Sequence, residues 1–458
     1  MSFSYYNPVQ IHFDVDILES LRNLAENELS SKRVLLVTSK SFNRQEEHSV
    51  LSDKSANLRS PTAALTSSKL LVGSLDSPDF SSQSLECQIE SNHSNLSQDS
   101  RIVDSLPCHT ERELVSQILD SNPAESKRAN LAQNIAKIFS NIIIYDSVNP
   151  NPQLESLQST KAELKGHYDA VIALGGGSVL DSAKFFALQN EIVANNGSLE
   201  IVGEAKAMPL FACPSTAGTG SELTQWATIW DSKANIKYSL SHKCLYPQIA
   251  FYDITLLLSL PLNLSIHTTL DSLSHAIESI WNKNANPIST QYAKAAIELI
   301  LENLPPLYEM LISLDSKDCT LNTANSRKSV KETTQNLRRN LALACMQSAL
   351  SFSNTQTALA HAISYPITMQ CNIPHGLACS FTLPILLDCI SDKNADFILR
   401  PYKQGIKNLF KTLHISSNPR DYGLDSTMIE DIFSSLNARA KNGLLDVAKA
   451  KKRMLSLL

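Results

Sequence analysis

The chain has 458 residues, of which 43% are hydrophobic and 19% are charged, an ordinary composition for a globular protein. This length exceeds what one hydrophobic core usually supports, so we expect two domains. A formal net charge of -5 gives no reason to expect nucleic acid or an anionic membrane as a partner.

The sequence also predicts a cytoplasmic protein that is not bound to a membrane. It has no uninterrupted run of about 18 apolar residues that would predict a membrane span. Its first residues lack the basic and then apolar pattern of a secretory signal. The nine cysteines show no CxxC pairing, which favours free thiols in a reducing compartment.

The first half of the chain alternates predicted strands with predicted helices. Short apolar runs rich in β-branched residues are typical of buried strands, and they occur at residues 33–38, 141–145, 168–174 and 208–213. Helical periodicity lies between them, for example at 129–139 and 180–188. This alternation predicts a parallel sheet with helices on both faces, over residues 1–256.

The pattern changes at about residue 257, where apolar residues begin to recur every three or four positions. Clear examples are residues 264–280, 291–301 and 341–363. We therefore predict an all-helical second domain over residues 257–458.

Two polar segments do not fit this division. Residues 46–105 are rich in Ser, Asn, Gln and Asp and have little apolar area to offset the entropy of ordering, so we predict a mostly disordered surface insertion. A shorter polar segment, residues 314–335, interrupts the helical half and predicts a second surface insertion.

A glycine-rich turn follows the third predicted strand. Leu174 ends the strand, residues 175–178 read Gly-Gly-Gly-Ser, and a helix is predicted to begin near Val179 with Asp181 in its first turn. Such a turn lets the backbone approach a ligand, and the N-terminus of the helix presents free N–H groups to an anion such as a pyrophosphate. A tight strand-to-helix turn without a ligand is the alternative.

A second loop of small residues follows the fourth predicted strand. Residues 214–222 read PSTAGTGSE, and their hydroxyl groups could hydrogen-bond a ribose or a phosphate. Ligands of parallel sheets bind at the carboxyl ends of the strands, so the two loops reinforce each other. An ordinary flexible loop is the alternative.

Asp271 and His275 are four residues apart in a predicted helix, which places both side chains on one face. By itself the pair could be a plain ion pair. His361 lies in another apolar helical segment and His375 in a turn, so three imidazoles occur in apolar surroundings where unpaired polar groups are costly. One carboxylate and three imidazoles suit Fe(II), Zn or a similar divalent ion.

Four segments together carry a resemblance to a known family. GGGSVLDSAK, PSTAGTGSE, DSLSHAIES and HAISYPITMQCNIPHG occur in that order and resemble the iron-containing alcohol dehydrogenases. Within that family, WATIWD, KYSLSH and WNKNANPIS look like the phosphonoacetaldehyde reductase branch. The resemblance covers most of the chain outside the two polar segments.

The resemblance implies a Rossmann-like dinucleotide-binding domain and a helical metal-binding domain, as in dehydroquinate synthase-like architectures, with the active site in the cleft. It implies an Fe(II) or Zn ion, NADH or NADPH, and a homodimer. The implied metal ligands are Asp271, His275, His361 and His375. The implied cofactor contacts are Ser39, Asn151, Gly176, Gly177, Ser178, Thr216, Thr219 and Lys237.

Two positions depart from the family pattern. Residues 38–40 read Thr-Ser-Lys where many members have an Asp that repels the 2′-phosphate of NADPH, so we expect both cofactors to work. Tyr365 stands where many members have a further histidine. Tyrosine can donate a proton but, with an ordinary pKa of about 10, would be a weak proton shuttle at neutral pH, and packing is an alternative role.

The resemblance implies metal-assisted reduction of a small aldehyde, most naturally phosphonoacetaldehyde to 2-hydroxyethylphosphonate. Lys283 and His242 are the candidate cations for the phosphonate. A family relative that acts on simple alcohols, diols or aldehydes is an alternative. A lyase of the dehydroquinate synthase type fits less well, because its substrate pocket is crowded with Lys and Arg. A non-catalytic nucleotide-binding protein has little reason to keep four buried candidate ligands.

Overall fold

We analysed a computed structural model of the chain, which describes residues 3–43, 128–195, 198–234, 236–315 and 324–458. The predicted Ser-rich insertion at 46–105 lies outside these ranges. Along the described helices, none is both long enough and apolar enough to cross a membrane.

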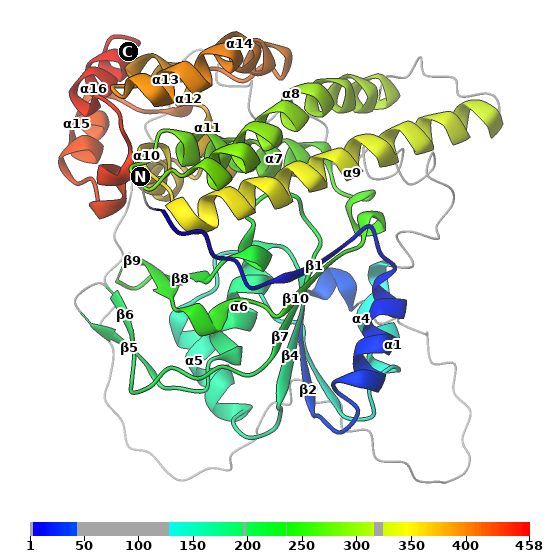
Figure 1. The fold of residues 1–458 in the computed structure, drawn as a ribbon. Coiled ribbons are helices and arrows are strands. Elements are labelled where there is room, and N and C mark those ends of the chain that lie inside the picture. Colours follow the sequence, from blue (N-terminus) through cyan, green and yellow to red (C-terminus); the bar gives the residue numbers. More distant parts are fainter. Residues whose placement is uncertain (1–2, 44–127, 196–197, 235, 316–323) are drawn as a thin grey trace, which may run out of the picture. The chain divides into compact units, whose positions relative to one another are not determined.

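A six-stranded parallel sheet forms the centre of the N-terminal half (Figure 1). Its spatial order is β1-β10-β7-β4-β2-β3. The strands are β1 (Gln10–Phe13), β2 (Val34–Val37), β3 (Ile142–Tyr145), β4 (Ala170–Gly175), β7 (Leu210–Pro214) and β10 (Ile249–Tyr252). The predicted parallel sheet is confirmed, and the four predicted strands are β2, β3, β4 and β7. The sequence analysis missed β1 and β10, which lie next to each other at one end of the sheet.

Side chains alternate along β4 between two apolar layers, because successive strand residues point to opposite faces. Ile172 packs in the layer that holds α1 (Ile17–Asn27) and α4 (Leu131–Ala136). Val171 packs in the layer that holds α5 (Leu154–Glu163) and α6 (Gly177–Ala187). Helices therefore cover both faces of the sheet, as predicted.

Two antiparallel hairpins flank the sheet and were not predicted. One consists of β5 (Ile192–Asn195) and β6 (Ser198–Ile201). The other consists of β8 (Trp226–Asp231) and β9 (Ile236–Ser241), with Trp230 opposite Lys237.

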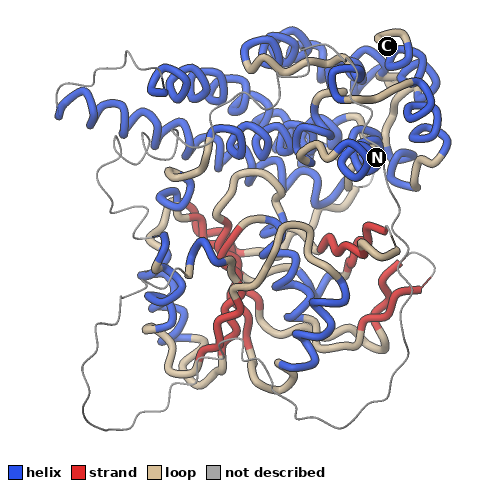
Figure 2. The backbone as a smooth tube through the Cα atoms, turned by 180° about the vertical axis from the view of Figure 1, so that it is seen from behind, coloured by secondary structure: helices blue, strands red, loops and turns tan. Residues whose placement is uncertain are grey.

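The C-terminal half is helical in the residues that the structure describes, apart from isolated bridges, and this confirms the predicted fold class. Its long helices are α7 (Leu262–Ile280), α8 (Pro287–Asp315), α9 (Ala324–Thr355) and α10 (Leu359–Cys371). The shorter ones are α11 (His375–Ser380), α12 (Leu383–Leu386), α13 (Lys393–Leu399), α14 (Lys403–Thr412), α15 (Ser426–Ser434) and α16 (Val447–Leu455). Figure 2 shows the strands gathered in one half and these helices in the other. The boundary at residue 256 itself stays a prediction.

The apolar stretch 341–363 spans two helices: α9 ends at Thr355, Gln356 has a left-handed φ of 68°, and α10 begins at Leu359. One expectation about the helical half was wrong. The polar segment 314–335 is not a loop throughout, since α9 begins at Ala324. Thr334 and Arg338 are buried, so the polar stretch of α9 packs one face and exposes the others.

Candidate metal and dinucleotide site

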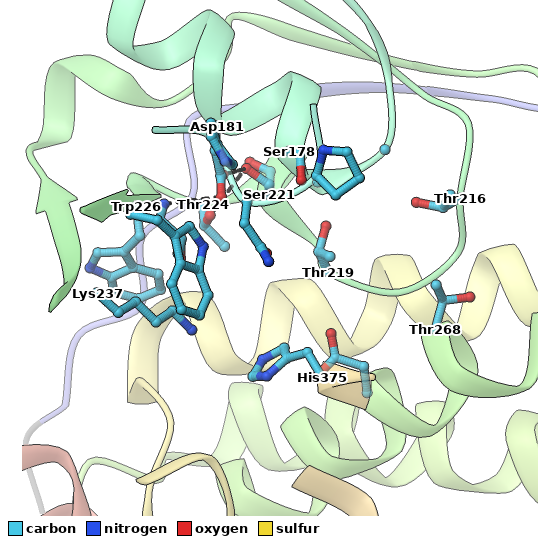
Figure 3. A pocket seen from close by; sticks show the side chains of 18 of the residues that line it. Ser178, Asp181, Thr216, Thr219, Ser221, Thr224, Trp226, Lys237, Thr268 and His375 are labelled. Carbon is cyan, nitrogen blue, oxygen red and sulfur yellow. Dashed lines mark hydrogen bonds between the residues drawn. The ribbon is translucent and has the colours of Figure 1, made fainter. Parts of the chain in front are cut away.

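A cavity of about 440 Å³ lies where the loops after β2, β3, β4 and β7 meet the helices of the C-terminal half (Figure 3). All thirteen residues that the sequence analysis assigned to the cofactor, the metal or proton transfer line it. They are Ser39, Asn151, Gly176, Gly177, Ser178, Thr216, Thr219, Lys237, Asp271, His275, His361, Tyr365 and His375. The structure thus brings together residues that are up to 336 positions apart in the sequence, between Ser39 and His375. Their individual roles stay predictions.

The glycine turn and the loop at residues 214–222 are packed against each other. A Cβ atom on Gly177 would lie 2.6 Å from Cγ2 of Thr219, so a larger residue would push the two segments apart. The helix after the turn begins at Gly177, two residues earlier than predicted. Because α6 starts inside the turn, the free N–H groups of its first residues lie at the cavity that Gly177 and Ser178 line.

Asp181 is not in the first turn of α6, as had been expected, but links three segments under the cavity. Its Oδ1 accepts a hydrogen bond from Ser221 Oγ at 2.7 Å, and its Oδ2 accepts one from Thr228 N at 3.0 Å. Nearby, the buried ammonium group of Lys184 donates to Ser221 O and Trp226 O, both at 2.6 Å. This buried polar network fixes the 214–222 loop to the β8–β9 hairpin.

One face of the β8–β9 hairpin forms a wall of the cavity. Alternate residues point into the cavity, and the residues between them are buried in the apolar layer beneath. The cavity-lining residues are Trp226, Thr228, Trp230, Lys237 and Ser239. The buried ones are Ala227, Ile229, Tyr238 and Leu240. Lys237 points into the cavity because side chains alternate between the two faces of strand β9.

Helix α7 carries Asp271 and His275 on one face, as their spacing predicted. Nε2 of His275 lies 3.9 Å from Oδ1 of Asp271, and Nε2 of His361 lies 3.4 Å from the same oxygen. The His275 and His361 rings stack with centroids 4.4 Å apart, and the His361 and His375 rings meet edge to face at 5.7 Å. Asp271, His275 and His361 are each no more than 6% exposed.

His375 reaches this group because Gly376 allows α11 to contact the backbone of α7. A Cβ atom on Gly376 would lie 1.9 Å from the carbonyl oxygen of His267 and 3.3 Å from Cβ of Asp271. Gly376 therefore permits the close helix contact that brings its neighbour His375, a candidate ligand, to the cluster.

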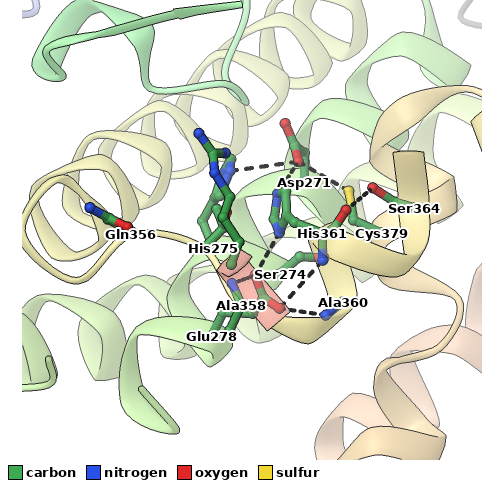
Figure 4. A network of polar contacts seen from close by, with 12 residues as sticks. Asp271, Ser274, His275, Glu278, Gln356, Ala358, Ala360, His361, Ser364 and Cys379 are labelled. Atoms are coloured by element: carbon green, nitrogen blue, oxygen red, sulfur yellow. Dashed lines mark hydrogen bonds and ion pairs between the residues drawn. The ribbon is translucent and has the colours of Figure 1, made fainter. Parts of the chain in front are cut away.

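Glu278 was missed by the sequence analysis, although it continues the face of α7 that carries Asp271 and His275 (Figure 4). Its carboxylate is fully buried and accepts hydrogen bonds from Ala358 N at 2.8 Å and Ala360 N at 2.6 Å, which caps the start of α10. It also lies 2.7 Å from Nδ1 of His361. The spacing i, i+4, i+7 was the signal that could have identified it.

The geometry around His361 fits a bound cation. With its Nδ1–H donated to Glu278, the imidazole presents the lone pair of Nε2 toward the Asp271 carboxylate. Nε2 of His361 and Nδ1 of His275 are buried and form no hydrogen bond within the described part of the chain. Nε2 of His361 and Oδ1 of Asp271, 3.4 Å apart in a buried site, need a proton or a metal cation between them.

The electrostatics of the site keep the lone pairs of His275 and His375 available, but not that of His361. Burial lowers the pKa of His275 to about 3, and burial together with the charge of Lys237 lowers the pKa of His375 well below its usual value. Burial also acts to lower the pKa of His361, but Cys379, Glu278 and Asp271 raise it overall. Without a cation, His361 would hold a second proton between two carboxylates. Metal and proton therefore compete for Nε2.

Cys379 is a fifth potential ligand, which the sequence analysis did not consider. One ligand atom each from Asp271, His361, His375 and Cys379 lies within 4.8 Å of the others. The thiol of Cys379 donates to Asp271 Oδ1 at 3.3 Å, and burial raises the pKa of Cys379 to about 12. In this arrangement the protonated thiol donates to the carboxylate and to His375 O at 2.9 Å, and we keep the carboxylate and three imidazoles as the predicted ligand set.

Tyr365 lies beside the candidate ligands and is more acidic than its usual value suggests. Its ring stacks on that of His375 with centroids 5.8 Å apart. Burial would raise its pKa, but the charges of Lys237 and Arg439 lower it to about 8. In this environment the hydroxyl of Tyr365 is therefore a better proton donor near neutral pH than that of an ordinary tyrosine.

The two cations proposed for a phosphonate, Lys283 and His242, do not line the cavity. Both are exposed, and the backbone N–H of Lys283 donates to Asn442 O. Arg439 was missed because it lies in a polar stretch near the end of the chain. It belongs to the 3₁₀ helix η8 (Ala438–Asn442) and does line the cavity.

Two family models match this chain, and the matches agree with the observed parallel sheet and the helical half that carries the carboxylate–imidazole cluster. The model of the iron-containing alcohol dehydrogenases matches residues 115–254. The C-terminal model of the Fe-containing alcohol dehydrogenase family matches residues 265–326 and 313–442. The two matches together cover more than half of the chain. The protein belongs to the iron-containing alcohol dehydrogenase family.

Individual relatives match part of the chain. Alcohol dehydrogenase 4 of Saccharomyces cerevisiae is 30% identical over 247 residues, which are 53% of this chain and 59% of that protein. Probable alcohol dehydrogenase EutG of Escherichia coli is 33% identical over 225 residues, which are 48% of this chain and 51% of that protein. The matches thus span between half and three-fifths of the length of these relatives.

Solved structures resemble the fold over the whole chain. A sulfoacetaldehyde reductase from Bifidobacterium kashiwanohense in complex with NAD+ superposes with a TM-score of 0.68 and 20% identity, covering 100% of this chain and 99% of that one. A 1,3-propanediol oxidoreductase superposes with a TM-score of 0.67 and 18% identity, covering 100% of both chains. At these identities the likeness establishes the fold alone.

Proposed function

We propose that the protein is a metal-dependent oxidoreductase that uses NADH or NADPH to reduce a small aldehyde to an alcohol. The natural substrate in this proposal is phosphonoacetaldehyde, which becomes 2-hydroxyethylphosphonate. The observation that carries the proposal is that a phosphate-binding turn and a buried carboxylate–imidazole cluster open into one cavity.

The dinucleotide is held at the sheet side of the cavity. Gly177 and Ser178 at the start of α6 receive the pyrophosphate, where free N–H groups and the helix dipole favour an anion. Thr216 and Thr219 contact the ribose and phosphate groups from the facing loop. Ser39 and Asn151 contact the remainder of the cofactor, and the absence of a carboxylate at residues 38–40 leaves room for NADPH.

The metal is held at the helical side by Asp271, His275, His361 and His375. When bound, a divalent ion polarises a carbonyl oxygen, and a reduced nicotinamide supplies the hydride. Glu278 holds the proton on Nδ1 of His361 and so keeps Nε2 free for the ion. Phe352 stacks on the His275 ring at 4.0 Å and excludes water from that side of the cluster.

Tyr365 is the candidate proton donor for the product. Its hydroxyl oxygen accepts a hydrogen bond from Nη1 of Arg439 at 3.1 Å, which leaves the phenolic proton available to the substrate.

A second candidate is an enzyme that acts on simple alcohols, diols or aldehydes. It is favoured by the names of relatives, which include a long-chain-alcohol dehydrogenase of Geobacillus thermodenitrificans and an NAD-dependent methanol dehydrogenase of Bacillus methanolicus. The aromatic wall formed by Trp226, Trp230 and Phe352 would also suit an apolar chain.

An anaerobic assay tests the proposal. Protein loaded with Fe(II) or with Zn is given phosphonoacetaldehyde, propanal or butanal, and NADH or NADPH absorbance is followed. We expect net cofactor consumption with an aldehyde, and the highest kcat/KM with phosphonoacetaldehyde. Turnover without net consumption of cofactor would instead indicate a lyase, and higher kcat/KM with plain aldehydes would favour the second candidate. Gel filtration of the same sample tests the homodimer.

A further inference from the structure

The side of the cavity next to Tyr365 carries two cations from distant parts of the chain. Lys237 comes from β9, and Arg439 comes from η8. Nζ of Lys237 lies 3.7 Å from the centre of the Tyr365 ring, and Nη1 of Arg439 donates to the hydroxyl of that ring at 3.1 Å. Both positively charged groups therefore contact the side chain of Tyr365.

Among the described residues, neither cation forms an ion pair with a carboxylate. Burial lowers the pKa of Lys237, and the charge of Arg439 lowers it further. Holding two like charges close together without an anion is unfavourable. An anionic ligand would remove this cost.

Arg439 still has hydrogen-bonding capacity for such a ligand. Nη2 donates to Ser239 Oγ at 2.7 Å and Nη1 donates to Tyr365. A guanidinium group has five N–H donors, so three remain in a planar arrangement that matches the oxygens of a phosphonate or a sulfonate.

The position of the pair sets the length of the ligand. Tyr365 contacts both cations, and its ring stacks on that of His375 with a centroid distance of 5.8 Å. An anionic group held by Arg439 therefore lies only a few bonds from a carbonyl at the metal ligands. That spacing fits a short aldehyde with an anionic group at its other end.

We propose that Arg439, supported by Lys237, is the subsite that selects aldehydes bearing a tetrahedral oxyanion, a phosphonate or a sulfonate. The inference rests on the proposed function and replaces Lys283 and His242 as the anion-binding residues.

The test compares Arg439→Gln with Lys441→Gln. Lys441 is an exposed cation in the same 3₁₀ helix and does not line the cavity, so its variant loses the same charge away from the subsite. In Arg439→Gln we expect kcat/KM for phosphonoacetaldehyde to fall about 10- to 100-fold, the effect of losing a charge-assisted hydrogen bond. Because Arg439 also donates to the Tyr365 hydroxyl, kcat/KM for butanal should fall too, but by a smaller factor. The ratio of kcat/KM for phosphonoacetaldehyde to that for butanal should therefore fall in Arg439→Gln, and Lys441→Gln should leave this ratio unchanged. An equal loss on both aldehydes would overturn the proposal.

Direct binding separates this inference from the proposed function. Tryptophan fluorescence, with Trp226 and Trp230 in the cavity wall, reports the binding of methylphosphonate, methanesulfonate and NADH. We expect Arg439→Gln to weaken methylphosphonate binding and to leave the Kd of NADH unchanged, with Arg439→Lys intermediate. Tighter wild-type binding of methylphosphonate than of methanesulfonate would assign the subsite to phosphonates, and the reverse order to sulfonates. Weakened NADH binding instead would assign Arg439 to the cofactor and overturn the proposal. If wild-type protein oxidises no cofactor with any aldehyde but still binds methylphosphonate through Arg439, the subsite stands and the proposed function fails.

Discussion

Replacing Glu278 by glutamine tests how the metal site is assembled. The carboxylate of Glu278 accepts hydrogen bonds on both oxygens: Oε2 faces Ala358 N and His361 Nδ1, and Oε1 faces Ala360 N. One buried side chain thus caps α10 and also sets the tautomer of a candidate ligand.

The expected effects follow from the loss of one acceptor. A glutamine keeps one carbonyl oxygen and presents an NH₂ group in place of the other, so in either orientation a buried N–H faces a donor. Each buried donor left unpaired costs about 1–3 kcal/mol, and we expect the free energy of unfolding to fall by about 2–5 kcal/mol. Loss of an outer partner of a metal-binding histidine should weaken metal affinity about 10- to 100-fold.

Two measurements check this prediction. Denaturant unfolding of metal-free protein gives the stability, and competition with a chelator gives the affinity for Fe(II) and for Zn. Glu302→Gln is the matched control, because Glu302 is an exposed carboxylate on α8. If stability falls while metal affinity stays within about twofold of wild type, Glu278 is a helix cap only and the account of His361 is wrong.

Three further predictions test other parts of the site. Gly376→Ala should weaken metal binding by about tenfold or more, because the new Cβ would lie 1.9 Å from His267 O and α11 would have to move. Chelator competition measures this affinity. Gly405→Ala is the control and should not change it, because its Cβ would meet only the side chain of Leu301. Lys184→Met should lower the free energy of unfolding by about 3–5 kcal/mol, because it leaves buried Asp181 and Glu222 without their cation; urea denaturation measures this. NADH and NADPH should both support turnover, and a preference for NADH above about a hundredfold in kcat/KM would contradict the interpretation of residues 38–40.

Local patterns were enough to predict most of the elements that hold the site, although not the β8–β9 hairpin. An apolar run such as residues 168–174 forms a strand because it is buried on both faces, which needs no knowledge of its neighbours. The four-residue spacing of Asp271 and His275 fixes their common face on any helix. The small residues at 175–178 and 214–222 indicated close packing, which the contact of Gly177 with Thr219 explains.

The sequence also determined the family, through four short segments whose order is specific, and with it the residues that line the cavity. Only the tertiary structure showed which other residues join them. The spacing of Glu278 could have placed it on the face of Asp271 and His275, but its contact with α10 was known only from the structure. Arg439 could be found only once η8 was known to lie across from β9. Lys283 and His242 looked equally suitable as cations until their exposure was known.

The difference has one physical reason. Periodicity and turn chemistry act between residues a few positions apart, so the chain itself reports them. Hydrogen bonds such as that between Arg439 and Ser239, 200 positions apart, depend on how separate elements pack, and no local pattern carries that information.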